Sequence, residues 1–268
     1  MNILVVNDDG IKAEGIVHLA EAAKTFGHVT VVAPAEQCSA MSQRITIRGS
    51  MMLKKCDDFP ISDVEAYSLT GTPADCVKVA MECILDEKPD VVFSGINKGF
   101  NCGVETCYSG TVGAAMEGLL KGVPAIAFSV DYNEEYGTCD AYIQEVIREI
   151  LRCGGEKGEI WNVNFPGVPA SECAGILRDR KLSRIPNWPD TFKAEETTED
   201  DMRFKDHTYG APALDEQVPK SQKINKTGKI FAISPLRPVV PGVVPGTDLD
   251  ALSRKCISIG RIRNQVLG

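Results

Sequence analysis

The first ten residues, MNILVVNDDG (Met1–Gly10), join a short apolar run to two adjacent carboxylates and a glycine. The run from Ile3 to Val6 predicts a buried strand, because its four residues are all aliphatic and polar residues flank it. A helix-period apolar pattern follows from Ile11 and ends near Gly27, and a second apolar run covers residues 29–33. The order strand, helix, strand is typical of a βα unit in a largely parallel sheet.

The same alternation continues to about residue 165. Further strands are predicted at residues 67–69, 91–93, 125–128 and 160–164, and further helices at residues 73–84, 111–120 and 141–151. Thr72-Pro73-Ala74-Asp75 begins the first of these helices with an N-cap, a proline at the first helical position and an acid at the third. We therefore expect an α/β fold: a three-layer, Rossmann-like, mostly parallel sheet with helices on both faces.

Two segments depart from this alternation. Residues 45–53 alternate apolar and polar side chains around Gly49, which favours an exposed hairpin or excursion over a core strand. The Gly-rich segment from Gly95 to Gly110 carries no secondary-structure signal and predicts a long loop. Long loops of this kind in compact domains are usually functional.

The periodicity degrades after residue 166. Residues 190–229 are polar, and residues 235–245 contain four prolines. We therefore predict a catalytic core over residues 1–166 and a smaller, irregular C-terminal lobe or oligomerisation arm over residues 167–268. The two can also be counted as one domain.

Composition excludes several classes of protein. With 43% hydrophobic and 25% charged residues, the 268-residue chain is typical of a folded globular protein. Its net charge of −8 disfavours a DNA or RNA duplex or an anionic membrane as partner. A signal peptide and an apolar stretch of membrane-spanning length are both absent from the sequence, so we expect a cytoplasmic protein. Its ten scattered cysteines form no CxxC pair, and only three histidines are present, so we expect reduced thiols and no structural zinc.

Asp8 and Asp9 directly follow the first predicted strand. In open α/β sheets, ligands bind at the carboxyl ends of the strands. Adjacent carboxylates repel each other unless a positive charge lies between them, and Gly10 lets the backbone turn so that both side chains converge. Two interpretations stay open for this motif: a divalent-cation site, or carboxylates that cap the next helix.

Two further motifs follow later strands. SGINKGFNCG (residues 94–103) combines three glycines with two asparagines, which permits close backbone approach to a ligand and supplies amide groups. In YSGTVGAA (residues 108–115), Ser109 is a plausible N-cap, and the following N–H groups can bind an anion. The alternative for Ser109 is a cap and nothing more.

These motifs are expected at one edge of the sheet, together with Ser39 from the loop after the second strand. The candidate metal ligands are then the carboxylates of Asp8 and Asp9, the Ser39 hydroxyl and an amide carbonyl from one of the asparagines in residues 94–103. A set composed only of oxygen donors suits Mg²⁺ or Mn²⁺ and does not suit zinc or copper. A phosphate would then be held by the metal, by the N–H groups near Ser109 to Thr111, and by Lys98. The chemistry indicated is metal-assisted phosphoryl transfer to water.

The same motifs resemble those of the SurE survival-protein family. The resemblance covers most of residues 1–166 and rests on NILVVNDDGIKAEGI (2–16), Ala33-Pro34 with QCSA (37–40), GTPADCV (71–77), SGINKGFNCG (94–103), YSGTVGAAMEG (108–118) and NVNFP (162–166). In the tail, Gly246-Thr247-Asp248 fits the family, whereas residues 255–260 depart from its Gly-Tyr and Thr-Pro-Leu pattern.

The resemblance implies a divalent-metal-dependent phosphatase. Such enzymes act on nucleoside 5′- and 3′-monophosphates and sometimes on short polyphosphate, so we expect a nucleoside monophosphate substrate, one Mg²⁺ or Mn²⁺ per subunit, and a homodimer or homotetramer. By position it implies catalytic roles for Asp8 and Asp9, metal ligation by Asp8, Asp9, Ser39 and Asn97, and phosphate binding by Asn97, Ser109, Gly110 and Thr111. Asp8 is either a nucleophile or a group that orients an activated water.

Other functions and residue roles remain as alternatives. A nucleotide-binding module without turnover would need the glycines and the helix start but not the acidic pair. A Rossmann oxidoreductase or a glycosyltransferase is disfavoured, since no GxGxxG follows the first strand. Lys98 is expected to be a solvated charge or a phosphate contact, and Arg44 to reach or cover the site. His18 is expected to be a surface or packing residue outside the mechanism.

Overall fold

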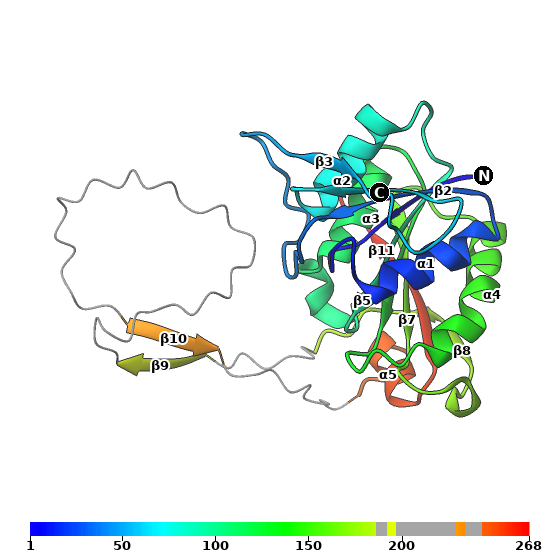
Figure 1. The fold of residues 1–268 in the computed structure, drawn as a ribbon. Helices are drawn as coiled ribbons and strands as arrows, with labels where there is room; N and C mark the ends of the chain where they lie inside the picture. Colours follow the sequence, from blue (N-terminus) through cyan, green and yellow to red (C-terminus); the bar gives the residue numbers. More distant parts are fainter. Residues whose placement is uncertain (186–191, 197–228, 234–242, 268) are drawn as a thin grey trace.

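A nine-stranded sheet forms the centre of the molecule in a computed structural model that describes residues 1–185, 192–196, 229–233 and 243–267 (Figure 1). Its strands, in sheet order, are β3 (Leu53–Lys55), β4 (Glu65–Leu69), β2 (His28–Pro34), β1 (Asn2–Val6), β5 (Val91–Lys98), β6 (Ala125–Val130), β7 (Glu159–Phe165), β11 (Ile257–Arg263) and β8 (Ile176–Arg180). A separate antiparallel ribbon pairs β9 (Phe192–Glu196) with β10 (Lys229–Ile233). The six central strands from β4 to β7 are all parallel, whereas β3 and β11 run antiparallel to their neighbours β4 and β7.

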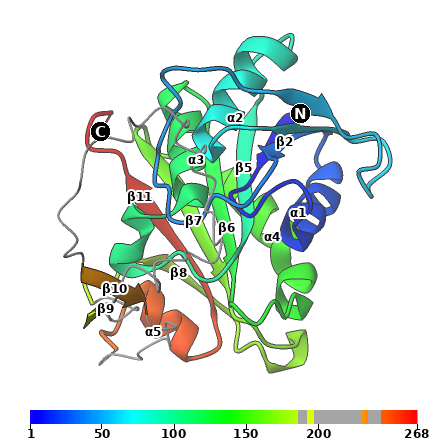
Figure 2. The same ribbon diagram turned by 60° about the vertical axis from the view of Figure 1, so that its left-hand side comes forward.

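Helices cover both faces of this sheet. The α-helices are α1 (Glu14–Lys24), α2 (Pro73–Val79), α3 (Gly110–Leu120), α4 (Gly137–Cys153) and α5 (Asp248–Ser253). Shorter turns of helix are η1 (Ala80–Ile84, a π-helix), η2 (Gly103–Cys107, 3₁₀) and η3 (Ala170–Glu172, 3₁₀). Figure 2 shows α2 and α3 on one face and α1 and α4 on the other. The expected three-layer α/β architecture is confirmed.

Strand β1 explains why the opening of the sequence is apolar without alternation. Ile3 and Val5 pack into the core beneath α1 and α4, and Leu4 and Val6 pack into the core beneath α2 and α3. All four side chains are buried because both faces of a parallel strand are covered by helices.

The prediction of one long loop from Gly95 to Gly110 is wrong in two places, because a strand covers its first residues and a short helix its middle. Strand β5 continues to Lys98, with a register shift against β6 between Ser94 and Asn97, and η2 occupies residues 103–107. Gly95 has φ +139°, and a Cβ there would lie 2.3 Å from the Phe128 carbonyl oxygen. Glycine therefore lets the strand approach β6 closely and continue past an irregularity, which the apolar pattern alone does not reveal.

Other boundaries differ in smaller ways. In the expected hairpin at residues 45–53, only β3 at its end is a strand, and the predicted helix from Pro73 becomes a π-helix at Ala80. The predicted boundary at residue 166 falls between strands of one sheet, since β7, β11 and β8 are neighbours. Part of the polar stretch at 190–229 lies outside the described residues, as do most residues of the proline-rich segment. Among the described residues, none of the helices is long and apolar enough to cross a membrane.

Candidate functional site

Asp8 lies where β1 ends, in a turn that the neighbouring residues close. The Asn7 side chain donates to the Gly10 carbonyl oxygen (2.8 Å) and accepts from the Gly10 N–H (3.2 Å). Gly10 has φ +99°, a conformation that favours glycine. The Cys38 N–H donates to the Asp8 carbonyl oxygen (2.7 Å), so the loop after β2 is attached to the loop after β1. These contacts place Asp8, Asp9 and Ser39 at one edge of the sheet, as the sequence predicts.

The start of α3 packs directly on the Asp8 side chain. The Thr111 hydroxyl donates to Asp8 Oδ1 at 2.5 Å, and both residues are buried. A Cβ at Gly110 would lie 2.8 Å from both Cβ and Oδ2 of Asp8, so only glycine fits there without displacement. The acidic pair and the helix start, which are about a hundred residues apart in the sequence, therefore form one site.

The pKa of the Asp8 carboxyl is raised to about 7: burial is the largest cause, the charge of Asp9 adds to it, and hydrogen bonds from Thr111 oppose it. Burial also raises the pKa of Asp9, although the Lys98 N–H and the Gln37 side chain oppose the shift. Two adjacent carboxyls therefore both have raised pKa values, and burial is the largest cause of each shift. The site is thus arranged to gain from a bound cation.

Asp9 is joined to Ser39 by a residue that we did not select from the sequence. Gln37 Nε2 donates to Asp9 Oδ1 (3.2 Å) and to Ser39 Oγ (2.9 Å). The other oxygen, Asp9 Oδ2, accepts from the Lys98 N–H (2.9 Å). An exposed glutamine in a polar loop has no chemical pattern that assigns it this role, and its sequence signal is its place at the start of the QCSA motif, two residues before Ser39.

Asn97 and Ser109 complete the expected set. Asn97 directs its amide nitrogen to the Gly99 carbonyl oxygen (2.6 Å), so its own amide oxygen points away from that contact. Ser109 Oγ accepts from the Val112 N–H (3.1 Å), which confirms its N-cap role. Gly110 and Thr111 are the first helical residues, whose N–H groups have no acceptor within the helix.

A buried network of amides holds the segment between β5 and α3. The Asn101 N–H donates to Asn164 Oδ1 (2.9 Å), and its carbonyl oxygen accepts from the side chains of Asn162 (2.8 Å) and Asn164 (3.0 Å). The buried Asp248 carboxylate accepts from the Gly103 N–H (2.7 Å). The NVNFP motif and the Gly-Thr-Asp motif of the tail therefore both support this segment.

The donor set fits a hard divalent cation. Two carboxylates, a hydroxyl and an amide are all oxygen donors, as Mg²⁺ and Mn²⁺ prefer. Among the residues that the structure describes, no group of three or more His, Cys, Asp and Glu side chains could hold a metal. The positively polarised Gln37 amide already bridges Asp9 and Ser39, two members of the set.

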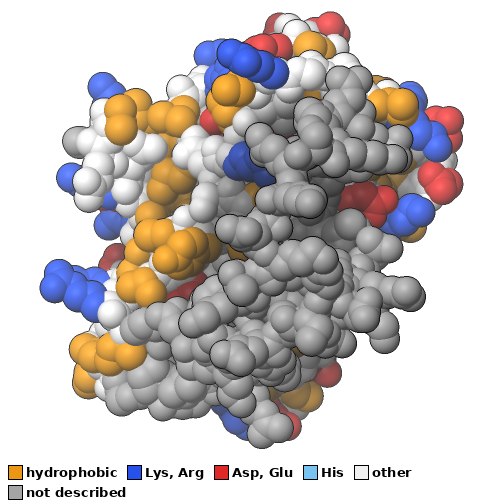
Figure 3. Space-filling model, turned by 90° about the vertical axis from the view of Figure 1, so that its left-hand side faces the viewer, with side chains coloured by type: hydrophobic (Ala, Val, Ile, Leu, Met, Phe, Trp, Pro, Cys, Tyr) orange, Lys and Arg blue, Asp and Glu red, His pale blue; other side chains and the backbone are white. Residues whose placement is uncertain are grey.

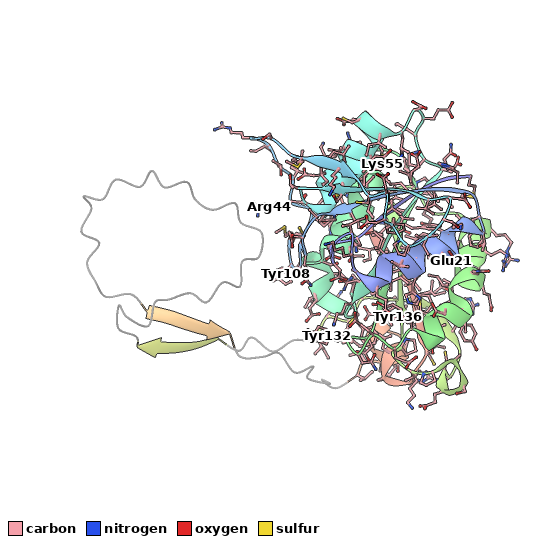
Figure 4. All side chains as sticks on the ribbon, in the orientation of Figure 1. Glu21, Arg44, Lys55, Tyr108, Tyr132 and Tyr136 are labelled. Atoms are coloured by element: carbon pink, nitrogen blue, oxygen red, sulfur yellow. The ribbon has the colours of Figure 1, made fainter. Side chains whose placement is uncertain are left out.

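The structure also shows the surroundings of Lys98, Arg44 and His18, the other residues singled out from the sequence. Lys98 forms an ion pair with Glu134 (2.5 Å). Arg44 is exposed, and it lies on the same side of the nine-stranded sheet as Tyr108 and Tyr132 (Figure 4). His18 Nδ1 lies 2.7 Å from Asp140 Oδ1, and the His18 ring stacks on the ring of Tyr136, which agrees with the expected packing role.

Comparison with known proteins identifies relatives that match about two thirds or more of the chain. The family model described as "Survival protein SurE" matches residues 3–186. A protein named 5′-nucleotidase SurE from Chlorobium limicola is 43% identical over 178 residues, which are 66% of this chain and 68% of that protein. The protein of the same name from Cytophaga hutchinsonii is 45% identical over 194 residues, or 71% and 73% of the two chains. The crystal structure of the SurE protein from Aquifex aeolicus superposes with a TM-score of 0.74 at 28% identity, covering 98% of this chain and 93% of that one.

Proposed function

This chain belongs to the SurE survival-protein family, and we propose that it is a divalent-metal-dependent phosphatase that hydrolyses nucleoside 5′-monophosphates to nucleoside and phosphate. The 5′-nucleotidase name of relatives that are 43–45% identical to it supports this class of reaction. Nucleoside 3′-monophosphates and short polyphosphate belong to the same proposal as further substrates. Self-association into a dimer or tetramer stays a prediction, which light scattering would measure.

One observation carries the proposal: the contact between Asp8 and the first turn of α3. Thr111 donates to Asp8 Oδ1, and Gly110 lies against the same side chain. A carboxylate pair is thereby placed beside the N–H groups of a helix start, which favour a bound phosphate. Phosphate binding alone does not need the buried acidic pair.

Asp8, Asp9, Ser39 and Asn97 would hold the cation. A bound Mg²⁺ or Mn²⁺ would neutralise the two carboxylates and polarise the phosphoryl oxygens. The N–H groups of Gly110 and Thr111 would orient the phosphate, and donors fixed in advance stabilise charge that develops in a transition state.

The Thr111 hydroxyl holds Asp8 in one orientation, ready either to attack phosphorus or to orient the attacking water. A quenched single turnover distinguishes these routes. A phospho-enzyme that forms and decays at the rate of turnover supports attack by Asp8, and turnover without one supports the water route.

The test of the proposed function is phosphate release from a panel of nucleoside monophosphates by metal-stripped protein. We expect release when Mg²⁺ or Mn²⁺ is restored and none without metal. The D9N variant should lose phosphate release far more than it loses nucleotide binding. Folded protein that releases no phosphate with any metal but still binds nucleotide would favour the binding-module alternative.

A further inference from the structure

An exposed aromatic ring lies at the rim of the site, where β6 ends. Tyr132 is 66% exposed, although every residue of β6 before it is buried. Lys98 Nζ lies 5.0 Å from the centre of its ring, and the same ammonium is fixed by the 2.5 Å ion pair with Glu134. The cation thus sits over the ring, while much of the rest of the ring is open to solvent.

The turn that carries this ring is braced by hydrogen bonds. The Tyr132 N–H donates to Asp131 Oδ1 (2.7 Å), and the Glu134 N–H donates to the Asp131 carbonyl oxygen (3.0 Å). Asn133 Nδ2 donates to the Gly167 carbonyl oxygen (2.8 Å), which attaches the turn to the residues after β7. An exposed ring on a braced turn is preorganised for contact, because little freedom remains to be lost on binding.

Gly99 places this ring next to the proposed phosphate site. Its N–H donates to the Val130 carbonyl oxygen (2.9 Å), and its φ is +107°. A Cβ at Gly99 would lie 3.7 Å from Tyr132 Cδ2 and 4.0 Å from Asn97 Nδ2. Glycine therefore leaves a space that the tyrosine ring borders on one side and the Asn97 amide on the other.

A nucleotide whose phosphate is bound at Asn97 and the start of α3 can extend its nucleoside only towards the surface. Buried Asp8 and α3 close the inner side, so sugar and base must extend towards the surface. The side of the molecule that carries Tyr108 and Tyr132 (Figure 4) also shows gathered hydrophobic side chains (Figure 3). Of these two rings, Tyr132 is the one that borders the space at Gly99 beside Asn97.

We propose that Tyr132 is a specificity-determining residue that stacks on the nucleobase and makes the enzyme prefer nucleotides over sugar phosphates without a base. This inference rests on the proposed function. An aromatic ring can stack on any base, so the expected selectivity is for the presence of a base and not for its identity. The Lys98–Glu134 pair acts as the support of the ring.

The experiment compares adenosine 5′-monophosphate with ribose 5-phosphate, which keeps the sugar and the phosphate but lacks the base. Wild type, Y132F and Y132L are assayed with metal restored. For Y132L we expect the KM for the nucleotide to rise roughly 10-fold, as about 1.4 kcal/mol of stacking predicts, with kcat changed less than about 2-fold. Ribose 5-phosphate should be hydrolysed equally by all three proteins, and Y132F should behave like wild type. Y108L is the matched control, because Tyr108 is 64% exposed.

Three outcomes would overturn the inference: equal loss on both substrates in Y132L, no change in Y132L on the nucleotide, or a base-dependent loss in Y108L instead. Should wild type hydrolyse neither substrate, the proposed function fails, and equilibrium binding then decides the role of the ring. Nucleotide binding that weakens in Y132L while ribose 5-phosphate binding does not would still support stacking, and unchanged nucleotide binding would refute it.

Discussion

Gly110 is a residue of the first turn of α3 that lies directly against the Asp8 side chain. In G110A the new methyl group would lie 2.8 Å from Asp8 Cβ, so the carboxylate or the helix start must move. Because a misplacement of about 1 Å costs on the order of 100-fold in rate, we expect kcat/KM to fall by roughly that factor. G155A is the control, since its nearest neighbour would be 3.9 Å away. Phosphate release measures both, and wild-type kinetics in G110A would contradict the placement of Asp8.

Gln37 is expected to lower the affinity of the site for metal. A cation that binds between Asp9 and Ser39 must displace the Gln37 amide from both oxygens. Since each net hydrogen bond is worth about 1 kcal/mol and two are displaced, Q37A should bind Mn²⁺ roughly 30-fold more tightly. The electron paramagnetic resonance signal of free Mn²⁺ measures this affinity. Q43A is the control, because the Gln43 amide donates to Glu117. Weaker Mn²⁺ binding by Q37A would show instead that Gln37 supports the metal.

At the scale of the elements, Asp75 joins α2 to the segment that precedes β3. Its carboxylate accepts from the N–H (2.9 Å) and hydroxyl (2.7 Å) of Thr46 and from the N–H of Thr72 (3.0 Å). Burial raises the pKa of this carboxyl, but the hydrogen bonds from Thr46 and Thr72 outweigh that effect and leave the pKa below its usual value. A pKa that is lower in the folded state means that the ionised carboxylate stabilises the fold.

This stabilisation is complete above the pKa of the unfolded chain, about 3.9 for aspartate, and is lost as the pH falls through the lower folded value. We expect D75N to lower the free energy of unfolding by about 1–3 kcal/mol at pH 7. The difference in the free energy of unfolding between D75N and wild type should become smaller below about pH 4. Urea denaturation at pH 7, 5 and 3.5 measures this, with D57N at an exposed aspartate as control. A difference independent of pH would exclude the ionised carboxylate as its cause.

The elements that the sequence predicts well are those whose pattern is local. Strand β1 follows from four aliphatic residues, and α2 from a capping box, which the structure shows between Thr72 and Asp75. The end of β5 could not be predicted, because the reason for a glycine at position 95 is the close approach of the Phe128 carbonyl oxygen, which belongs to another strand. Likewise Gln37 and the amide network around Asn101 act through contacts with residues that are remote in the sequence.

For the whole molecule, the acidic pair is expected to make stability depend on metal. A ligand present at 100 times its dissociation constant stabilises the folded state by about 2.7 kcal/mol. Wild type in Mn²⁺ at that concentration should therefore unfold at a higher urea concentration than wild type in a chelator. Without metal, D9N should be more stable than wild type, because it removes a carboxylate that repels Asp8. Equal stability of wild type with metal and with chelator would argue against the proposed cation site.

The place of β11 in the sheet has a consequence for how the chain folds. β11 lies between β7 and β8, and among the residues that the structure describes it is the strand that pairs with β8. During synthesis, this pairing cannot form until residues 257–263 have left the ribosome, and the edge of β7 that β11 covers stays unpaired for the same time. Late, non-local pairing slows folding, and an open strand edge invites association with other chains. The pairing of residues 257–263 therefore determines when this part of the sheet is completed and the edge of β7 is covered.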